Sequence, residues 1–186
     1  MDPSIVDDTF TDFGNLDWSE LTALASLEGK NLCENGCPPT VQPNPEVLDG
    51  VCQFGLPENW GDIEDPTSPC GNYFPLIYHA GSFSVQNGMG QGLLLVEGDL
   101  TLRGNFTFYG IVIVQGRFAT AGTKNAVFGA VLASNVAIDV DQTITGDSEI
   151  HYSRCTVQRS ILNNANLSRA RPLAERSWVD LTGVVN

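Results

Sequence analysis

The sequence predicts a mostly β protein: a short right-handed parallel β-helix (β-solenoid) of about four coils, with an N-terminal helix before it and a C-terminal capping helix after it. Three observations predict this fold. The chain has an internal repeat of 18–19 residues, its glycines recur at fixed places in the repeat, and short β-branched or aliphatic runs follow one another between residues 76 and 155 without a helical pattern. At 186 residues, 42% of them hydrophobic, the chain is long enough for one packed domain.

The repeat is clearest in residues 92–104 and 110–122, which align without a gap and share three glycines and an aliphatic tetrad. A weaker copy covers residues 129–138, where an asparagine replaces the second glycine, and a fourth begins at Glu149. Asparagine tolerates left-handed backbone better than most residues, so this exchange suits a turn. The residues expected at the solenoid corners are Gly92, Gly98, Gly104, Gly110, Gly116, Gly122, Gly129 and Asn135.

Stacking of the coils would place Leu94 over Val112 and Val112 over Val131, and such ladders would form the core. An antiparallel sandwich or barrel also has short strands joined by turns. It gives no reason, however, for glycine triplets at a constant offset, so the repeat favours the solenoid.

A helix is predicted over residues 17–28. Asp17 and Glu20 have the spacing of a capping box, the following residues form an apolar stripe, and Gly29 ends the helix. Residues 30–75 are rich in proline and glycine and predict an irregular loop.

A second helix is predicted to begin at Thr156, with Val157, Ile161 and Leu162 facing inward. The organisation expected is one structural domain in three parts. Residues 1–75 form an acidic arm, a helix and a Cys/Pro-rich loop packed on the solenoid, residues 76–155 form the solenoid, and residues 156–186 form the C-terminal helix and tail.

The cysteines indicate disulfide bonds in an oxidising compartment, because Cys33, Cys37, Cys52 and Cys70 cluster in the irregular loop. A zinc site and reduced structural thiols are the alternatives, but the spacing lacks the paired short separations of a zinc ribbon or finger. Four cysteines allow three pairings. Sequential pairing closes the shortest loops and is the one expected, which would leave Cys155 as a buried thiol.

The chain is strongly acidic, with 22 acidic and 9 basic residues and a net charge of −13. This charge argues against binding to nucleic acid or to an anionic membrane, and no apolar run is long enough to span a bilayer. Fourteen acidic residues and one basic residue lie in residues 1–65, whereas residues 154–186 contain five arginines. The acidic part is either a solvated surface or a partner for the arginine-rich part, within one chain or between neighbours.

The sequence has no nucleophile elbow, P-loop, zinc-protease motif or dinucleotide fingerprint, so no catalytic residue and no cofactor are predicted. Glu149 and His151 would share one face of a strand, where a solvated surface explains them better than acid–base chemistry. Asp139, Asp141 and Asp147 could gather a calcium ion, although their spacing matches no established calcium loop.

Residues 90–106, with the glycines around Leu-Leu-Leu-Val and Gly-Asp-Leu-Thr-Leu, resemble a coil of bacterial envelope proteins related to PilX-type pilus-assembly proteins. Tyr73-Phe74-Pro75, Tyr152-Ser153-Arg154-Cys155 and Arg176-Ser177-Trp178 resemble other segments of that domain. The resemblance implies an extracytoplasmic, non-enzymatic domain, the soluble part of a protein tethered by a prepilin-like hydrophobic helix. The acidic start of this chain does not look like a signal peptide, which fits either a cytosolic protein or an excised soluble fragment.

The function expected is therefore that of a non-catalytic structural or adhesive domain of the bacterial cell envelope, associated with a pilus. Its partners would be further copies of itself or other envelope and pilus subunits, with no nucleic acid and no membrane insertion by this fragment. One alternative is a carbohydrate-binding or carbohydrate-cleaving β-helix, which needs a groove lined by Tyr109, Tyr152, Phe108 or Trp178 together with paired carboxylates. The other is a bactofilin-like cytosolic scaffold that polymerises through bare coil ends and leaves all its thiols reactive.

Overall fold

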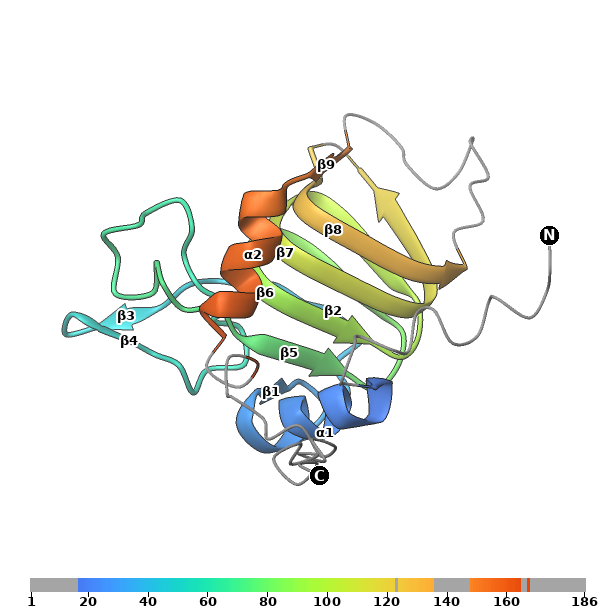
Figure 1. Ribbon diagram of the computed structural model, residues 1–186, viewed down its shortest axis with the longest axis horizontal. Coiled ribbons are helices and arrows are strands. Elements are labelled where there is room, and N and C mark those ends of the chain that lie inside the picture. The colour runs from blue at the N-terminus through green and yellow to red at the C-terminus, as the bar shows by residue number, and fades with distance from the viewer. Residues whose placement is uncertain (1–16, 123, 136–147, 165–166, 168–186) are drawn as a thin grey trace, which may run out of the picture.

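The computed structural model describes residues 17–122, 124–135, 148–164 and 167. Over these residues the chain is mostly β, with one helix before the strands and one after them (Figure 1). The elements are α1 (Trp18–Glu28), β1 (Lys30–Asn31), β2 (Thr40–Val41), β3 (Val47–Leu48), β4 (Val51–Cys52), β5 (Leu76–His79), β6 (Phe83–Val96), β7 (Leu100–Ala121), β8 (Ala126–Asn135), β9 (Glu149–Tyr152) and α2 (Arg154–Leu162).

The strands form a parallel β-solenoid of about three turns, as the sequence predicts. The ladder runs β1-β5-β6-β7-β8-β9, with β2 beside β6, and every pair in it is parallel. The expected fourth coil is only partly present among the described residues. Its segment β9 pairs with Ala126–Gly129 of β8, and the chain then enters α2. The right-handed sense of winding stays a prediction.

The predicted aliphatic ladder is confirmed. Leu94 pairs with Val112, Val112 pairs with Val131, and Ile77 extends the column on the other side of Leu94. Ile77 and Leu94 are fully buried and lie with Val112 in one core cluster inside the solenoid, and the partly buried Val131 packs against this cluster. Burying each such side chain contributes about 1.5–3 kcal/mol, so the repeated column is a main source of stability.

The same strands also bury their outer face. Leu93, Leu95, Ile111 and Ile113 alternate with the inward column and form a second cluster with Leu21 and other residues of the helices. Because side chains alternate across a strand, a segment covered on both faces must be apolar at every position. This explains why the repeat carries a continuous aliphatic tetrad instead of an alternating pattern.

Three of the expected corner glycines, Gly92, Gly110 and Gly129, pair directly in successive coils. Their φ angles are +109°, +157° and +148°. A Cβ at Gly110 would meet the carbonyl of Gly92, and one at Gly129 would meet the carbonyl of Gly110. Both the backbone conformation and the close approach of the coils therefore exclude a side chain in this column.

The other corners have different reasons for glycine. Gly104 and Gly122 have positive φ, but Gly98 and Gly116 do not, and there the constraint is close contact: the Gly116 amide donates to the Gly98 carbonyl at 3.2 Å. The repeat aligns Asn135 with Gly116, but the two residues do not pair in the structure. Asn135 pairs with Arg117, because the register shifts between Val114 and Arg117.

The solenoid begins earlier in the chain than the sequence predicts. Lys30 pairs with Ile77, and Thr40–Val41 pair with Ser84–Val85. The backbone amide of Gln91 also donates to the Trp60 carbonyl at 2.8 Å. Parts of the segment expected to be irregular thus form a partial first rung. Two-residue strands between prolines and glycines carry no detectable periodicity, so the sequence could not reveal them.

Helix α1 agrees with its prediction. The Asp17 side chain accepts from the Glu20 amide at 2.8 Å, and the Glu20 carboxylate accepts from the Asp17 amide at 3.1 Å, which completes the capping box. Gly29 is the C-cap of the helix, and a side chain is excluded at this position because a Cβ there would meet the carbonyl of Leu76. Leu21 and Ala25 are buried against the solenoid.

Helix α2 begins two residues earlier than predicted, and its inward face differs from the prediction. Ser160 is fully buried, whereas Ile161 and Leu162 are 42% and 64% exposed and only Val157 is half-buried against the core. Ser160 donates to the Thr156 carbonyl at 2.9 Å, so its small side chain can be buried with its hydroxyl satisfied where the helix meets the strands.

Cys155 was expected to be a buried thiol, and this prediction is wrong. It is free and exposed, and it lies in the first turn of α2.

Candidate functional site

Two disulfides crosslink the segment that precedes the solenoid. Cys33 bonds to Cys37 and Cys52 bonds to Cys70, which is the sequential pairing expected from the sequence. The second bond closes residues 52–70 within the segment 42–75, here called the crosslinked loop. In this loop the hairpin β3–β4 projects from the solenoid (Figure 1).

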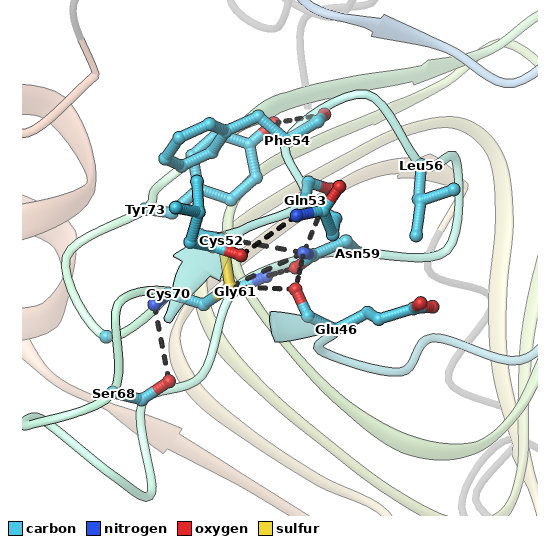
Figure 2. The surroundings of a disulfide bond; sticks show 12 residues. Glu46, Cys52, Gln53, Phe54, Leu56, Asn59, Gly61, Ser68, Cys70 and Tyr73 are labelled. Atoms are coloured by element: carbon cyan, nitrogen blue, oxygen red, sulfur yellow. Dashed lines mark hydrogen bonds between the residues drawn. A yellow bond between two sulfur atoms is a disulfide. The ribbon is translucent and has the colours of Figure 1, made fainter. Parts of the chain in front are cut away.

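The buried side chain of Asn59 lies at the centre of the crosslinked loop, next to the Cys52–Cys70 disulfide (Figure 2). Its amide nitrogen donates to the carbonyls of Glu46 at 3.1 Å and Gln53 at 3.0 Å, and its oxygen accepts from the Gly61 amide at 3.2 Å. One side chain thus bonds three backbone groups of the loop, and the carbonyls of Glu46 and Gln53 also accept backbone hydrogen bonds from the amides of Gln53 and Leu56. The sequence gives no signal for this role.

Trp60 and Gln91 attach the crosslinked loop to the solenoid. The Trp60 ring is fully buried and packs edge-on against Phe106 and Phe108, whose rings lie inside the coils. The side-chain nitrogen of Gln91, Nε2, donates to the carbonyls of Gly71 and Tyr73 at 3.1 and 2.7 Å. The loop is therefore part of the solenoid core and not a separate appendage.

Lys30 fixes the loop from β1. Its Nζ donates to the carbonyls of Phe54 and Leu56, both at 2.6 Å, and lies 5.4 Å from the centre of the Tyr73 ring. Burial lowers the pKa of Lys30 to about 8, and the nearby charge of Glu58 acts in the opposite direction.

One candidate binding surface is an apolar groove of about 280 Å³ between α1, the outer face of the strands and α2. Its walls are almost wholly hydrophobic, and Ile161 at its edge is 42% exposed. It is lined by Leu21, Leu93, Ile111, Ile113, Ala130, Leu132, Val157, Ile161 and Leu167. Hydrophobic surface in a concave site is typical of contacts with apolar ligands or with other proteins.

A second candidate surface is an aromatic ladder on another outer face. The rings of Tyr109 and Phe128 stack at 4.9 Å, and those of Phe128 and His151 at 5.1 Å. His151 Nε2 lies 2.6 Å from the carboxylate of Glu149. Burial raises the pKa of Tyr109, and the charge of Glu64 adds to the effect.

The structure brings together only part of the carbohydrate site that the sequence suggests. Tyr109 lies in the ladder and Tyr152 is 76% exposed, but Phe108 is fully buried inside the coils. Trp178 and the calcium candidates Asp139, Asp141 and Asp147 lie outside the described residues.

The alternative that the acidic part contacts the arginine-rich part stays a prediction. The guanidinium of Arg159 lies over the Phe74 ring at 5.4 Å, so this arginine contacts an aromatic ring. Arg169, Arg171 and Arg176 lie outside the described residues.

The chain matches no protein-family model, no curated protein and no solved structure. Neither α1 nor α2, the helices of the described part, has the length and apolar character needed to cross a membrane.

Proposed function

We propose that this chain is a non-catalytic structural or adhesive domain of the bacterial cell envelope, which acts outside the cytoplasm in association with a pilus. The observation that carries this proposal is the pair of disulfides: Cys33–Cys37 is built into the partial first rung, and Cys52–Cys70 into the crosslinked loop that packs on the solenoid core. Structural disulfides form and persist in oxidising compartments. The resemblance of residues 90–106 to a coil of pilus-assembly envelope proteins supports the same location.

We further propose that the apolar groove contacts another envelope or pilus subunit. Its walls come from both helices and the outer face of the solenoid, so it is a fixed concave surface that needs no rearrangement to receive an apolar side chain. Non-catalytic assembly modules act through such surfaces.

The location is tested by expressing the native reading frame in its own bacterium and shearing the cell surface. We expect the domain in the sheared fraction, with four cysteines protected from alkylation until a reductant is added. Recovery in the cytoplasm with all five thiols reactive would contradict the proposal and favour the polymer-forming scaffold.

The contact is tested with Ile161→Glu, which places a charge at the groove edge. Leu162→Glu is the matched control, because Leu162 is 64% exposed on the same helix and does not line the groove. We expect Ile161→Glu to lower co-purification with surface assemblies severalfold and Leu162→Glu to leave it unchanged. Equal behaviour of the two variants would refute a contact through the groove.

The aromatic ladder favours a second candidate, a carbohydrate-binding surface, because aromatic rings and a nearby carboxylate are common in sugar sites. Glycan-array binding that is lost in Phe128→Ala but kept in Phe54→Ala would support it, since Phe54 is 52% exposed and lies in the crosslinked loop. Absence of binding in the unmodified protein would remove this candidate.

A further inference from the structure

Two cysteines and a histidine lie close together at the start of the solenoid. The ligating atoms of Cys33, Cys37 and His79 are all within 4.8 Å of one another. Cys33 and Cys37 lie between β1 and β2 of the partial first rung, whereas His79 ends β5 in the next rung. The three side chains therefore meet through the stacking of two successive rungs.

The backbone on both sides of the two cysteines is held without the help of their disulfide. The Leu32 amide donates to the Tyr78 carbonyl at 2.9 Å, and the Ser84 amide donates to the Pro39 carbonyl at 3.0 Å. These parallel pairings precede Cys33 and follow Cys37 in the chain. Reduction of the disulfide would therefore leave both sulfur atoms next to His79.

The imidazole of His79 is fixed in orientation. It is 1% exposed and stacks on Phe83 with ring centres 4.2 Å apart. Nδ1 lies 2.9 Å from the Gly81 carbonyl, and Nε2 lies 3.0 Å from the carbonyl of Pro38, the residue after Cys37. A proton on Nδ1 can be donated to Gly81, and such a backbone carbonyl partner is typical of metal-binding histidines. The Pro38 carbonyl lies in front of Nε2, so it must turn away before a metal can bind there.

The surroundings of the sulfur atoms also suit metal ligands. The Ala80 amide donates to Cys33 Sγ at 3.4 Å, which stabilises negative charge on the sulfur. Cys37 is exposed and Cys33 is half-buried, so the cluster opens to solvent on one side. Zinc binds thiolates at about 2.3 Å and imidazole at about 2.0 Å, which requires ligand atoms roughly 3.5–4 Å apart. Small movements of the reduced side chains reach that spacing.

We propose that reduction of the Cys33–Cys37 disulfide converts this cluster into a metal site, in which two thiolates and His79 Nε2 bind a zinc-like cation. A dithiol or phosphine reductant supplies two electrons, the sulfur–sulfur bond breaks, and two protons complete the two thiols. Binding of the cation then releases those protons, and water or another ligand fills the open fourth position. The disulfide and the metal exclude each other, so the redox state of the pair controls occupancy. This inference does not depend on the proposed envelope function.

The test uses the full chain with Cys155→Ser, reduced under anaerobic conditions and titrated with Co²⁺ and then Zn²⁺. We expect one equivalent of Co²⁺ to bind with thiolate-to-metal charge-transfer and tetrahedral d–d absorption, and Zn²⁺ to displace it. The oxidised protein should give neither band. Cys37→Ser should weaken binding at least about tenfold, and His79→Gln should weaken it and shift the d–d bands.

The matched control is Cys52→Ser with Cys70→Ser, which removes the other disulfide and should leave cobalt binding unchanged. Near-ultraviolet circular dichroism of each sample monitors the fold. The proposal is overturned if the reduced protein takes up no cobalt, if Cys37→Ser binds as tightly as the parent, or if binding follows Cys52 and Cys70. Unfolding on reduction would also overturn it, because the rungs must hold the reduced cysteines in place.

Discussion

The solenoid and the crosslinked loop are in direct contact, but different interactions hold each of them. In the solenoid, a residue such as Leu94 packs on its counterpart in the next coil, so the same contact recurs along the stack. In the crosslinked loop, each contact occurs once: one disulfide, one asparagine that binds three backbone groups, and one buried lysine of β1 that binds carbonyls of the loop. Recurring contacts can be recognised in a sequence because they produce a repeat, whereas single contacts leave no pattern.

The largest expected effect comes from breaking the recurring contact. Leu94→Ala should lower the free energy of unfolding by about 3–5 kcal/mol, because it removes a fully buried side chain and leaves a cavity between Ile77 and Val112. Denaturant unfolding measures the change. Leu27→Ala is the control, since Leu27 is 83% exposed and its loss should cost less than about 0.5 kcal/mol. Similar losses for both would mean that the column is not the core.

Removing the larger crosslink tests the other region. Cys52→Ser with Cys70→Ser should lower the free energy of unfolding by about 3 kcal/mol, mainly by releasing the unfolded chain from a closed loop. Hydrogen exchange should show lost protection in residues 42–75 and retained protection in β6 and β7. Equal loss in both regions would show that the solenoid depends on the crosslink.

Substitution of a corner glycine by alanine should lower the stability of the protein more than the same substitution in the crosslinked loop. Gly110→Ala should cost about 2 kcal/mol, because its φ is positive and its new Cβ would meet the Gly92 carbonyl. Gly55→Ala in the crosslinked loop has open space and should be close to neutral. Thermal unfolding of the two variants compares them, and an equal shift would refute the close approach of the coils at this corner.

The smallest effect is a pH dependence that comes from Lys30. Its pKa is about 8 in the folded protein and about 10.5 when unfolded, so between these values the unfolded chain binds more protons. Stability should therefore rise with pH in this window, by roughly 1 kcal/mol once partial contact with solvent is allowed for.

Unfolding measured between about pH 7 and 9.5 should show this rise in the parent and not in Lys30→Met. Burial raises the pKa of Tyr73 and Tyr78 to about 12, so their opposite effect begins only above the ordinary tyrosine value of about 10. The same pH dependence in both proteins would show that burial does not lower the pKa of Lys30.

The sequence predicts the solenoid, its glycine corners and α1 because each rests on a local or periodic rule. The capping box of Asp17 and Glu20 needs only four residues, and the column of Leu94 and Val112 needs only the repeat. Prediction from the sequence fails where tertiary contacts decide which residue is buried or which residues pair. The inward residue of α2 is Ser160 instead of Ile161, and a register shift near Gly116 moves Asn135 out of the expected column.

The candidate sites divide in the same way. Clustering in the sequence correctly indicates disulfides at Cys33, Cys37, Cys52 and Cys70. Neither the role of Asn59 nor the position of His79 beside the first pair could be predicted. The first depends on how the irregular loop folds around one side chain, and the second on how a partial rung stacks on the next. The sequence around a single polar residue in a proline-rich loop does not indicate whether that residue is buried or exposed.

The parallel stacking of successive coils is tested most directly by nuclear Overhauser contacts between the methyl groups of Ile77, Leu94, Val112 and Val131. The structure predicts contacts in that order only, each between residues one strand spacing apart, about 4.8 Å. Close cross-strand Hα–Hα contacts in place of this series, with Leu94 facing an antiparallel neighbour, would contradict the solenoid.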